Sequence, residues 1–264
     1  MSHYKILTLT LFILVLFKHV NNLAIQQSIT AGEKVLLKSL KSQLNDLIAT
    51  FKKQLIAKFI LIDNTTITPL LATFAVMKKN LNDIPNLPSC LAKQEPVLNK
   101  SVNTIIQMRT TVKTKQVQPE LLQLTKVANG IINNKINKLL QTTTKVNVNS
   151  LVNQTRSIRT DINNILLQSL KIIGQLRNIV NTNFGFIFNM FSVMVTCILH
   201  ANNNKLQIYN TFLTSTEKGN GLTSSLDGQL SSLLGDLQDY SITFGRVSLE
   251  TIDDILYKIT LQLI

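Results

Sequence analysis

The chain has few of the residues that break helices and few of those that carry chemistry. Its 264 residues include nine glycines, five prolines and no tryptophan. Leu, Ile, Val, Asn, Lys, Gln and Thr dominate instead, and apolar residues recur with a period near that of a helix. This composition and period predict an all-α fold. Because Asn and Thr are poor helix formers, we expect the helices to be stabilised mainly by packing.

Histidine and cysteine are also scarce, which argues against most catalytic and metal sites. Of three histidines only His200 lies beyond the N-terminal segment, and the two cysteines are Cys90 and Cys197. The cysteines have no histidine partner by sequence pattern, and their spacing suits neither a zinc site nor a redox pair. We therefore expect no enzymatic activity, no metal and no cofactor.

The first 24 residues predict a secretory signal peptide. Lys5 precedes the apolar run 6–17, which has the length of a signal-peptide core, and we place cleavage after Ala24. A retained anchor is the alternative, although the run is short for a bilayer span. We expect residues 25–264 to form a single secreted, extracellular domain.

Export also sets the expectations for cysteine and asparagine. Two cysteines in an oxidising compartment predict one intramolecular disulfide, Cys90–Cys197, with buried free thiols or a cross-link between chains as alternatives. N-glycosylation sequons begin at Asn64, Asn99 and Asn153. We favour Asn64 and Asn99, which fall near predicted helix ends, over Asn153 within a predicted helix.

The formal charge of +13 is unevenly distributed along the chain. Residues 25–213 carry 22 Lys or Arg against 7 Asp or Glu, whereas residues 214–264 carry 3 against 7. Residues 214–264 could therefore form an acidic subdomain that packs on the basic body. The basic body could instead face an anionic surface. Without a Lys/Arg run or an aromatic-basic stacking motif, we expect no specific nucleic-acid binding.

The most apolar stretch, 184–199, has apolar residues on every side of a helix. We expect a central helix over about 166–199 that other helices surround, in an elongated bundle of long amphipathic helices. Its candidate core or pocket residues are Phe184, Ile187, Phe188, Phe191, Met194 and Ile198. The range 179–199 has the length of a bilayer span, but its asparagines disfavour one, so we expect no transmembrane helix.

Proline and glycine predict where the other helices begin and end. A first helix is expected over 29–62, and Thr68-Pro69 has the pattern of a helix start. Residues 84–96, with three prolines, predict a loop, and Pro119 marks another restart. Gly219-Asn220-Gly221 predicts a break, and a last helix is expected from Ser248.

Three functions fit these expectations. The first is a non-enzymatic binding or effector protein that acts through its surface on an extracellular macromolecule. The second is a carrier of lipid or another apolar ligand, since flexible Phe and Met side chains can line a pocket. The third is a structural coiled-coil component, which the proline breaks disfavour.

Overall fold

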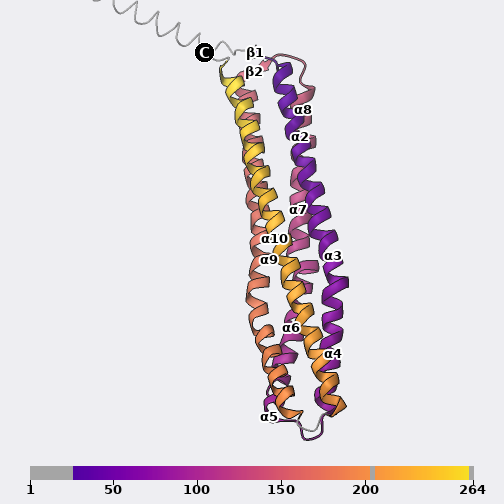
Figure 1. Cartoon of the computed structure of the whole chain (residues 1–264). Helices are drawn as coiled ribbons and strands as arrows, with labels where there is room; N and C mark the ends of the chain where they lie inside the picture. The colour runs from indigo at the N-terminus through magenta and orange to yellow at the C-terminus, as the bar shows by residue number, and fades with distance from the viewer. Residues whose placement is uncertain (1–25, 203–205, 262–264) are drawn as a thin grey trace, which may run out of the picture. The chain divides into compact units, whose positions relative to one another are not determined.

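The all-α class is confirmed by a computed structural model, which describes residues 26–202 and 206–261 (Figure 1). The predicted signal peptide lies outside the described residues. Four long helical runs make up most of the described residues. The arrangement of all four as one bundle stays a prediction.

The first two runs each alternate between α-helical and π-helical segments. The first is one helix over Ala31–Asp83. Its segments are α2 (Ala31–Phe51), η1 (Lys52–Ala57), α3 (Lys58–Ile62), η2 (Asp63–Ile67) and α4 (Thr68–Asp83). The second run follows the short α5 (Ser89–Ala92). Its segments are α6 (Glu95–Thr110), η3 (Thr111–Lys115), α7 (Val117–Gly130), η4 (Ile131–Ile136) and α8 (Asn137–Gln141).

The last two runs are unbroken α-helices. They are α9 (Val148–Ala201) and α10 (Gln207–Leu261). Two short strands, β1 (Gln26–Gln27) and β2 (Val146–Asn147), pair antiparallel, with Gln26 opposite Asn147.

The predicted helix start at Thr68-Pro69 is wrong, because the chain passes this proline without a break. Ile67 and Thr68 both keep right-handed helical dihedrals, and Pro69 stands at the beginning of α4. A proline lacks the N–H that an α-helix needs, and its ring collides with the carbonyl one turn earlier. The wider π turn η2 comes directly before it, where this collision has to be relieved.

The predicted break at Gly219–Gly221 is also wrong, as is the separate last helix from Ser248, because α10 is continuous there. Gly219 is required by packing instead. A Cβ atom at this position would lie 2.7 Å from Cε1 and 2.9 Å from Cζ of Phe191 on α9. Only glycine allows so close an approach, whereas nothing lies within 4 Å of a Cβ at Gly221.

The expectation that α9 is surrounded on every side is wrong. Phe186, Phe188, Val193 and Val195 are half-buried, and Leu199 is 57% exposed. Together with Ala31–Asp83, α9 is one of two described helices long and apolar enough to cross a membrane. Core helices of soluble proteins meet the same criterion of length and composition, so the absence of a transmembrane helix stays a prediction.

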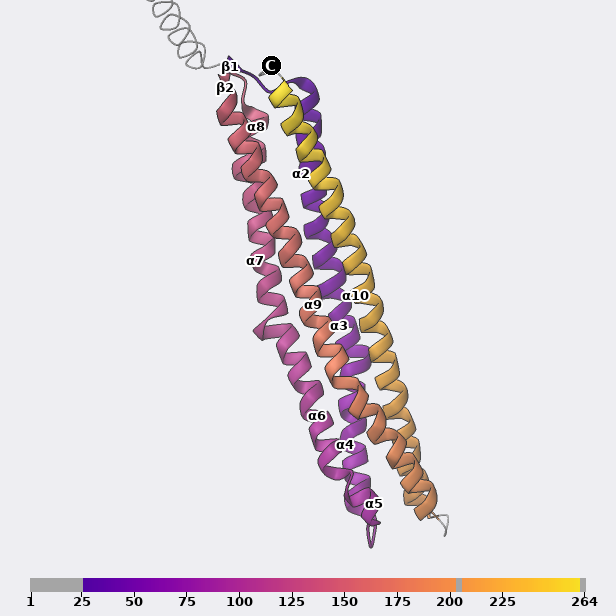
Figure 2. The ribbon, with the colours of Figure 1, turned by 90° about the vertical axis from the view of Figure 1, so that its left-hand side faces the viewer.

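The contacts divide the chain into two compact units, each built from parts of all four runs. The described residues of unit 1 are 26–44, 129–163 and 246–261, and those of unit 2 are 45–128, 164–202 and 206–245. Within each unit, segments of the four runs lie side by side in both views (Figures 1 and 2). The single-domain assignment and the acidic subdomain 214–264 stay predictions.

Unit 1 has an apolar interior with ion pairs at its edges. Thr30 and Glu33 form a reciprocal capping box at the start of α2: the Thr30 amide donates to Glu33 Oε2 at 2.7 Å, and the Glu33 amide donates to Thr30 Oγ1 at 3.3 Å. Arg159 donates two hydrogen bonds to the carboxylate of Asp253, from Nε at 2.6 Å and from Nη2 at 3.2 Å. The fully buried apolar core residues described in unit 1 are Leu37, Leu40, Leu44, Ile136, Ile158, Ile162, Ile252, Ile255 and Ile259.

Unit 2 mixes aromatic packing with buried hydrogen bonds. Phe74 of α4 stacks on Phe191 of α9, with ring centroids 5.9 Å apart. The buried Asn80 donates to Ser215 of α10 at 3.3 Å. Satisfied polar groups of this kind fix which residues face each other, because a shifted register would leave them unpaired in the interior.

Candidate functional site

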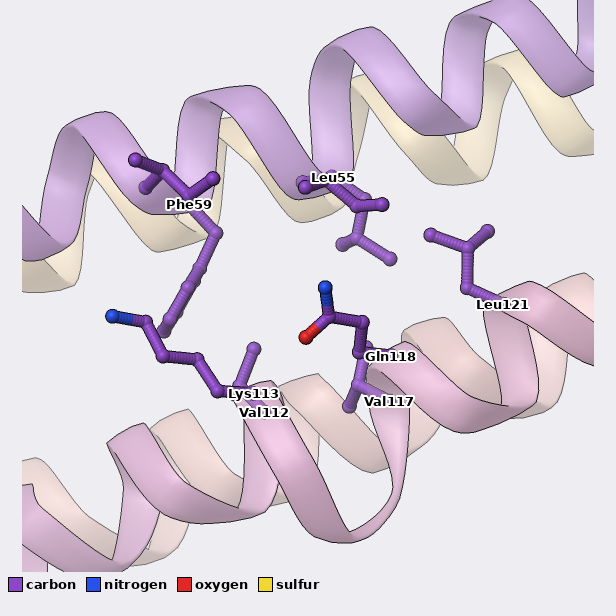
Figure 3. A pocket seen from close by; sticks show the side chains of 9 residues that line it. Leu55, Phe59, Val112, Lys113, Val117, Gln118 and Leu121 are labelled. Carbon is purple, nitrogen blue, oxygen red and sulfur yellow. The ribbon is translucent and has the colours of Figure 1, made fainter.

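An apolar hollow in unit 2 is the best-formed candidate for a binding site (Figure 3). It lies between the helix Ala31–Asp83 and the end of η3 with the beginning of α7, and its cavity volume is about 30 Å³. This is room for one or two water molecules and is far below the roughly 300–1,000 Å³ typical of small-molecule sites, so the hollow admits only the end of a ligand. The lining residues are Leu55, Ile56, Phe59, Ile60, Val112, Lys113, Val117, Gln118 and Leu121.

Two side chains of the lining can bind a polar group. The amide of Gln118 points into the gap between the two helices, towards Leu55, and the side chain of Lys113 extends beside Phe59 (Figure 3). The remaining lining residues are apolar. The hollow therefore combines an apolar wall with one ammonium group and one amide, which is the usual composition of a small-molecule site.

A buried carboxylate holds Lys113 at this position. Asp63 of η2 is 1% exposed, and Arg109 Nε lies 2.8 Å from its Oδ1. Arg109 Nη2 donates to Asp63 Oδ2 at 3.0 Å, and Lys113 Nζ forms an ion pair with the same oxygen. Two cations thus share one carboxylate, so the group carries one net positive charge beside the hollow.

The hollow coincides with irregular turns on both of its walls. η1 supplies Leu55 and Ile56, and η3 supplies Val112 and Lys113. Between η3 and α7 the helix is interrupted at Gln116, whose dihedrals are φ −133° and ψ −64°. Pro119 follows, and its missing N–H explains why the regular ladder fails here. A π turn is wider than an α turn and is frequent at functional sites.

A second, more polar hollow lies on another side of the same helix in unit 2. It is lined by residues of α3, η2 and α10, among them Lys58, Leu61, Thr65 and Gln229. Thr66 beside it donates to Gln229 Oε1 at 3.2 Å, and Lys58 lies 3.7 Å from Asp236. Its polar groups are largely paired with one another, so it is the weaker candidate.

The six apolar residues predicted for a core or pocket belong to the core. Five of them, Phe184, Ile187, Phe191, Met194 and Ile198, are buried, and Phe188 is half-buried. None of them lines the apolar hollow or the more polar one. The Phe184 and Phe188 rings pack against each other, with centroids 6.2 Å apart.

The predicted disulfide is not formed: Cys90 and Cys197 are free thiols and are not at disulfide distance. They are nevertheless neighbours, although 106 residues separate them in the chain. Burial raises the pKa of Cys197 to about 11, and a hydrogen bond with Cys90 contributes to this rise. Cys90, on α5, is half-buried. The sequence therefore predicted correctly that Cys90 and Cys197 are neighbours, but the prediction that they form a disulfide is wrong.

The three sequons have exposed or half-exposed asparagines but buried hydroxyl residues. Asn64 lies within the helix Ala31–Asp83 rather than at an end, Asn99 lies near the beginning of α6, and Asn153 lies within α9. Their partners Thr66, Ser101 and Thr155 are buried. Each hydroxyl donates a hydrogen bond within the protein; Ser101 Oγ, for example, donates to the carbonyl of Val97 at 2.8 Å. These buried contacts account for the three hydroxyl residues without glycosylation. Glycosylation stays a prediction.

The hollow and Asp63 were not identified from sequence, although a signal for them exists. Apolar buried residues step by five from Ile62 to Ile67 and again from Val112 to Val117. A step of five does not fit an α-helix, but it fits one π turn, which holds an extra residue. Among the described residues, no three His, Cys, Asp or Glu side chains are grouped as a metal site would require.

The arrangement defines an all-α protein with a small apolar hollow next to a buried, doubly paired carboxylate. No protein-family model matches the chain, and neither a curated protein nor a solved structure shows a significant similarity to it. Function therefore has to be argued from the site itself.

Proposed function

We propose that this protein is a secreted, non-enzymatic binding protein and that the hollow of unit 2 receives the apolar end of a small ligand. The observation that carries the proposal is the lining: Leu55, Phe59, Val117 and Leu121 supply apolar surface, and Lys113 is the only charged residue among the described residues that line the hollow. Burial of apolar surface provides affinity, at roughly 25 cal/mol per Å², and a few polar groups provide orientation. The apolar run 6–17 supports export.

Native mass spectrometry of the protein secreted from eukaryotic cells tests this function. The same sample is measured again after denaturation, and the medium is assayed for the protein. We expect an additional mass that is lost on denaturation and that extracts into organic solvent. A chain retained inside the cell would refute export, and a chain that purifies empty and binds no added apolar compound would refute the carrier function.

A second candidate is binding to an anionic macromolecule through the surface. Among the described residues, ion pairs engage seven of the chain's 14 acidic side chains. In unit 2 a set of exposed lysines has no ion pair among the described residues: Lys52, Lys53, Lys79, Lys93, Lys115 and Lys126. The surface charge of unit 2 that is not neutralised by these ion pairs, and that a partner would meet, is therefore mainly positive.

Salt dependence distinguishes the two candidates. Binding through surface lysines should weaken steeply as sodium chloride rises, because exposed charges are screened within about 10 Å at 0.1 M. Binding of an apolar ligand in the hollow should change little. Retention on a sulfated-glycan column that is no greater than that of an unrelated protein of equal net charge would refute the second candidate.

A further inference from the structure

We propose that unit 2 binds the surface of an anionic lipid bilayer through the outer face of the first helical run, a function separate from that of the hollow. Six exposed apolar residues and five exposed lysines make up this surface, which we call the basic apolar face. Its apolar residues are Ala57, Ile60, Leu61, Ala72, Ala75 and Val76. Its lysines are Lys52, Lys53, Lys58, Lys78 and Lys79.

The apolar residues lie on one side of the helix. Ile60 borders the hollow towards the second run, and Leu61 borders the more polar hollow towards α10, so these two span the outer side between both neighbours. From Ala57 to Val76 exposed positions recur every three or four residues, which is the spacing of one helix face. An apolar segment of 18 residues in this helix is only 44% buried, so the core does not account for its apolar character.

The charge of the face is positive. Between residues 47 and 82 the one acidic residue is Asp63, which is 1% exposed and pairs with two cations. Two lysines lie at each end, at 52–53 and 78–79. At about 1.5 Å per residue these pairs are about 35–40 Å apart, so both reach lipid headgroups only when the helix lies along the bilayer surface.

The outer surface of α10 in unit 2 is of the opposite kind. Over residues 207–245 its exposed side chains are mainly Ser, Thr, Asn and Gln, and Ile242 is the one large apolar residue among those exposed there. Exposed Glu217, Asp236 and Asp239 outnumber the single exposed Lys218 in this segment. An anionic surface therefore attracts the basic apolar face and repels the surface of α10, which determines the side of unit 2 that meets the lipid.

The lysines favour a lipid surface over a second copy of the chain. Two basic apolar faces in contact would bring lysines against lysines with no exposed acidic residue between 47 and 82 to compensate them. Anionic headgroups neutralise lysines, whose long side chains keep the charge in the headgroup layer while apolar neighbours enter the lipid. Amphipathic helices bind bilayer surfaces in this way.

Co-sedimentation of the full chain with lipid vesicles tests the proposal. Vesicles of phosphatidylcholine mixed with phosphatidylserine are compared with vesicles of phosphatidylcholine alone. Leu61→Ser combined with Val76→Ser removes apolar surface at exposed positions that do not line the apolar hollow. Leu122→Ser combined with Leu167→Ser is the control, because these exposed leucines of unit 2 lie on α7 and α9.

A second pair of variants tests the charges. Lys52→Gln combined with Lys53→Gln removes two lysines of the face. Lys115→Gln combined with Lys126→Gln is the control, because it changes the net charge equally at exposed positions of the second run. Circular dichroism establishes that each variant is folded.

We expect the protein to bind the mixed vesicles at least tenfold more tightly than vesicles of phosphatidylcholine alone, and to be released as sodium chloride rises. Each double variant of the face should weaken binding about tenfold, since each removes apolar burial or two attractive charges. Both control variants should bind like the parent.

Four results would overturn the proposal. The first is no binding, or equal binding to both kinds of vesicle. The second is binding that depends on the lysines but not on Leu61 and Val76, which charge alone explains. The third is a dimer in ultracentrifugation that the Leu61 and Val76 variant dissociates, without vesicle binding. The fourth is a glycan on Asn64, which is exposed in the middle of the face and would hold it away from lipid. The hollow is tested separately, because neither Leu61 nor Val76 lines it.

Discussion

Replacing Gly219 with alanine should destabilise the protein, because a side chain does not fit between α10 and α9 at this point. The added Cβ would lie 2.7 Å and 2.9 Å from two ring atoms of Phe191, and 3.4 Å from the sulfur of Met77. The Phe191 ring is fully buried and stacks on Phe74. It therefore cannot turn away without losing contacts elsewhere, and the helices have to move apart.

The magnitude follows from two opposing effects. Overpacking a well-filled core costs about 1–3 kcal/mol, whereas Gly→Ala in the interior of a helix gains about 1 kcal/mol of helix propensity. Gly221→Ala is the matched control, because it lies two residues further on in the same helix with nothing within 4 Å of its Cβ. It should gain the propensity without the clash, so the two variants should differ by about 1–3 kcal/mol.

Urea unfolding monitored by far-ultraviolet circular dichroism measures both free energies of unfolding. We expect the midpoint of Gly219→Ala to fall below that of Gly221→Ala at an unchanged slope. In a Phe191→Leu background the gap should narrow, because the ring that causes the clash is gone. Variants of equal stability, or a gap that persists without the ring, would show that the contact between Gly219 and Phe191 is not what requires glycine.

Three further results are expected from the same reasoning. Asp63→Asn should lower the free energy of unfolding by about 1–3 kcal/mol, because it removes the charge from buried hydrogen bonds. Asp254→Asn, in an exposed ion pair, should lower it by about 0.5 kcal/mol or less. Equal losses of the two variants in urea titrations would contradict this expectation. Ellman's reagent should modify Cys90 before Cys197 in the native state and detect two thiols after denaturation, and an intact disulfide in the mass spectrum would contradict it. Stability should fall between about pH 9 and 11, because folded Cys197 keeps its proton up to a pKa of about 11 while the unfolded thiol loses it near its ordinary value of 9.0. Cys197→Ala should make this fall shallower in thermal unfolding across that pH range, and an unchanged curve would refute the assignment.

The helical class could be predicted from the sequence because it depends on local period and composition. Breaks in the helices were harder to predict, since proline and glycine are ambiguous signals. Pro85 and Pro88 do end a helix, and α4 stops at Asp83. Pro69 does not, because a π turn precedes it. Which outcome occurs depends on the hydrogen bonds of the preceding turn, and these are not visible in the residue types.

The candidate site could not be predicted, because it depends on which helices face each other. Asp63 lies 46 residues before Arg109, and no local pattern joins them. Likewise, nothing in the local sequence distinguishes Gly219 from Gly221. Only the position of the Phe191 ring makes glycine necessary at position 219. The buried steps of five near Ile67 and Val117 were the one readable signal, and they indicate irregular turns rather than a ligand.

The π turns also determine how the chain tolerates changes in length. Each of them accommodates one residue more than an α turn, so a deletion within η2 could be absorbed by conversion to a regular α turn without unravelling the helix. A one-residue deletion in the regular helix α2 has no extra residue to give up, so it turns the helix on one side of the deletion by about 100° relative to the other side. After a deletion in η2 the faces on either side stay in phase, but Pro69 loses the wider turn that relieves its collision with the carbonyl one turn earlier. The extra residue in η2 therefore serves Pro69, and it is the place where the first helical run tolerates a shorter chain.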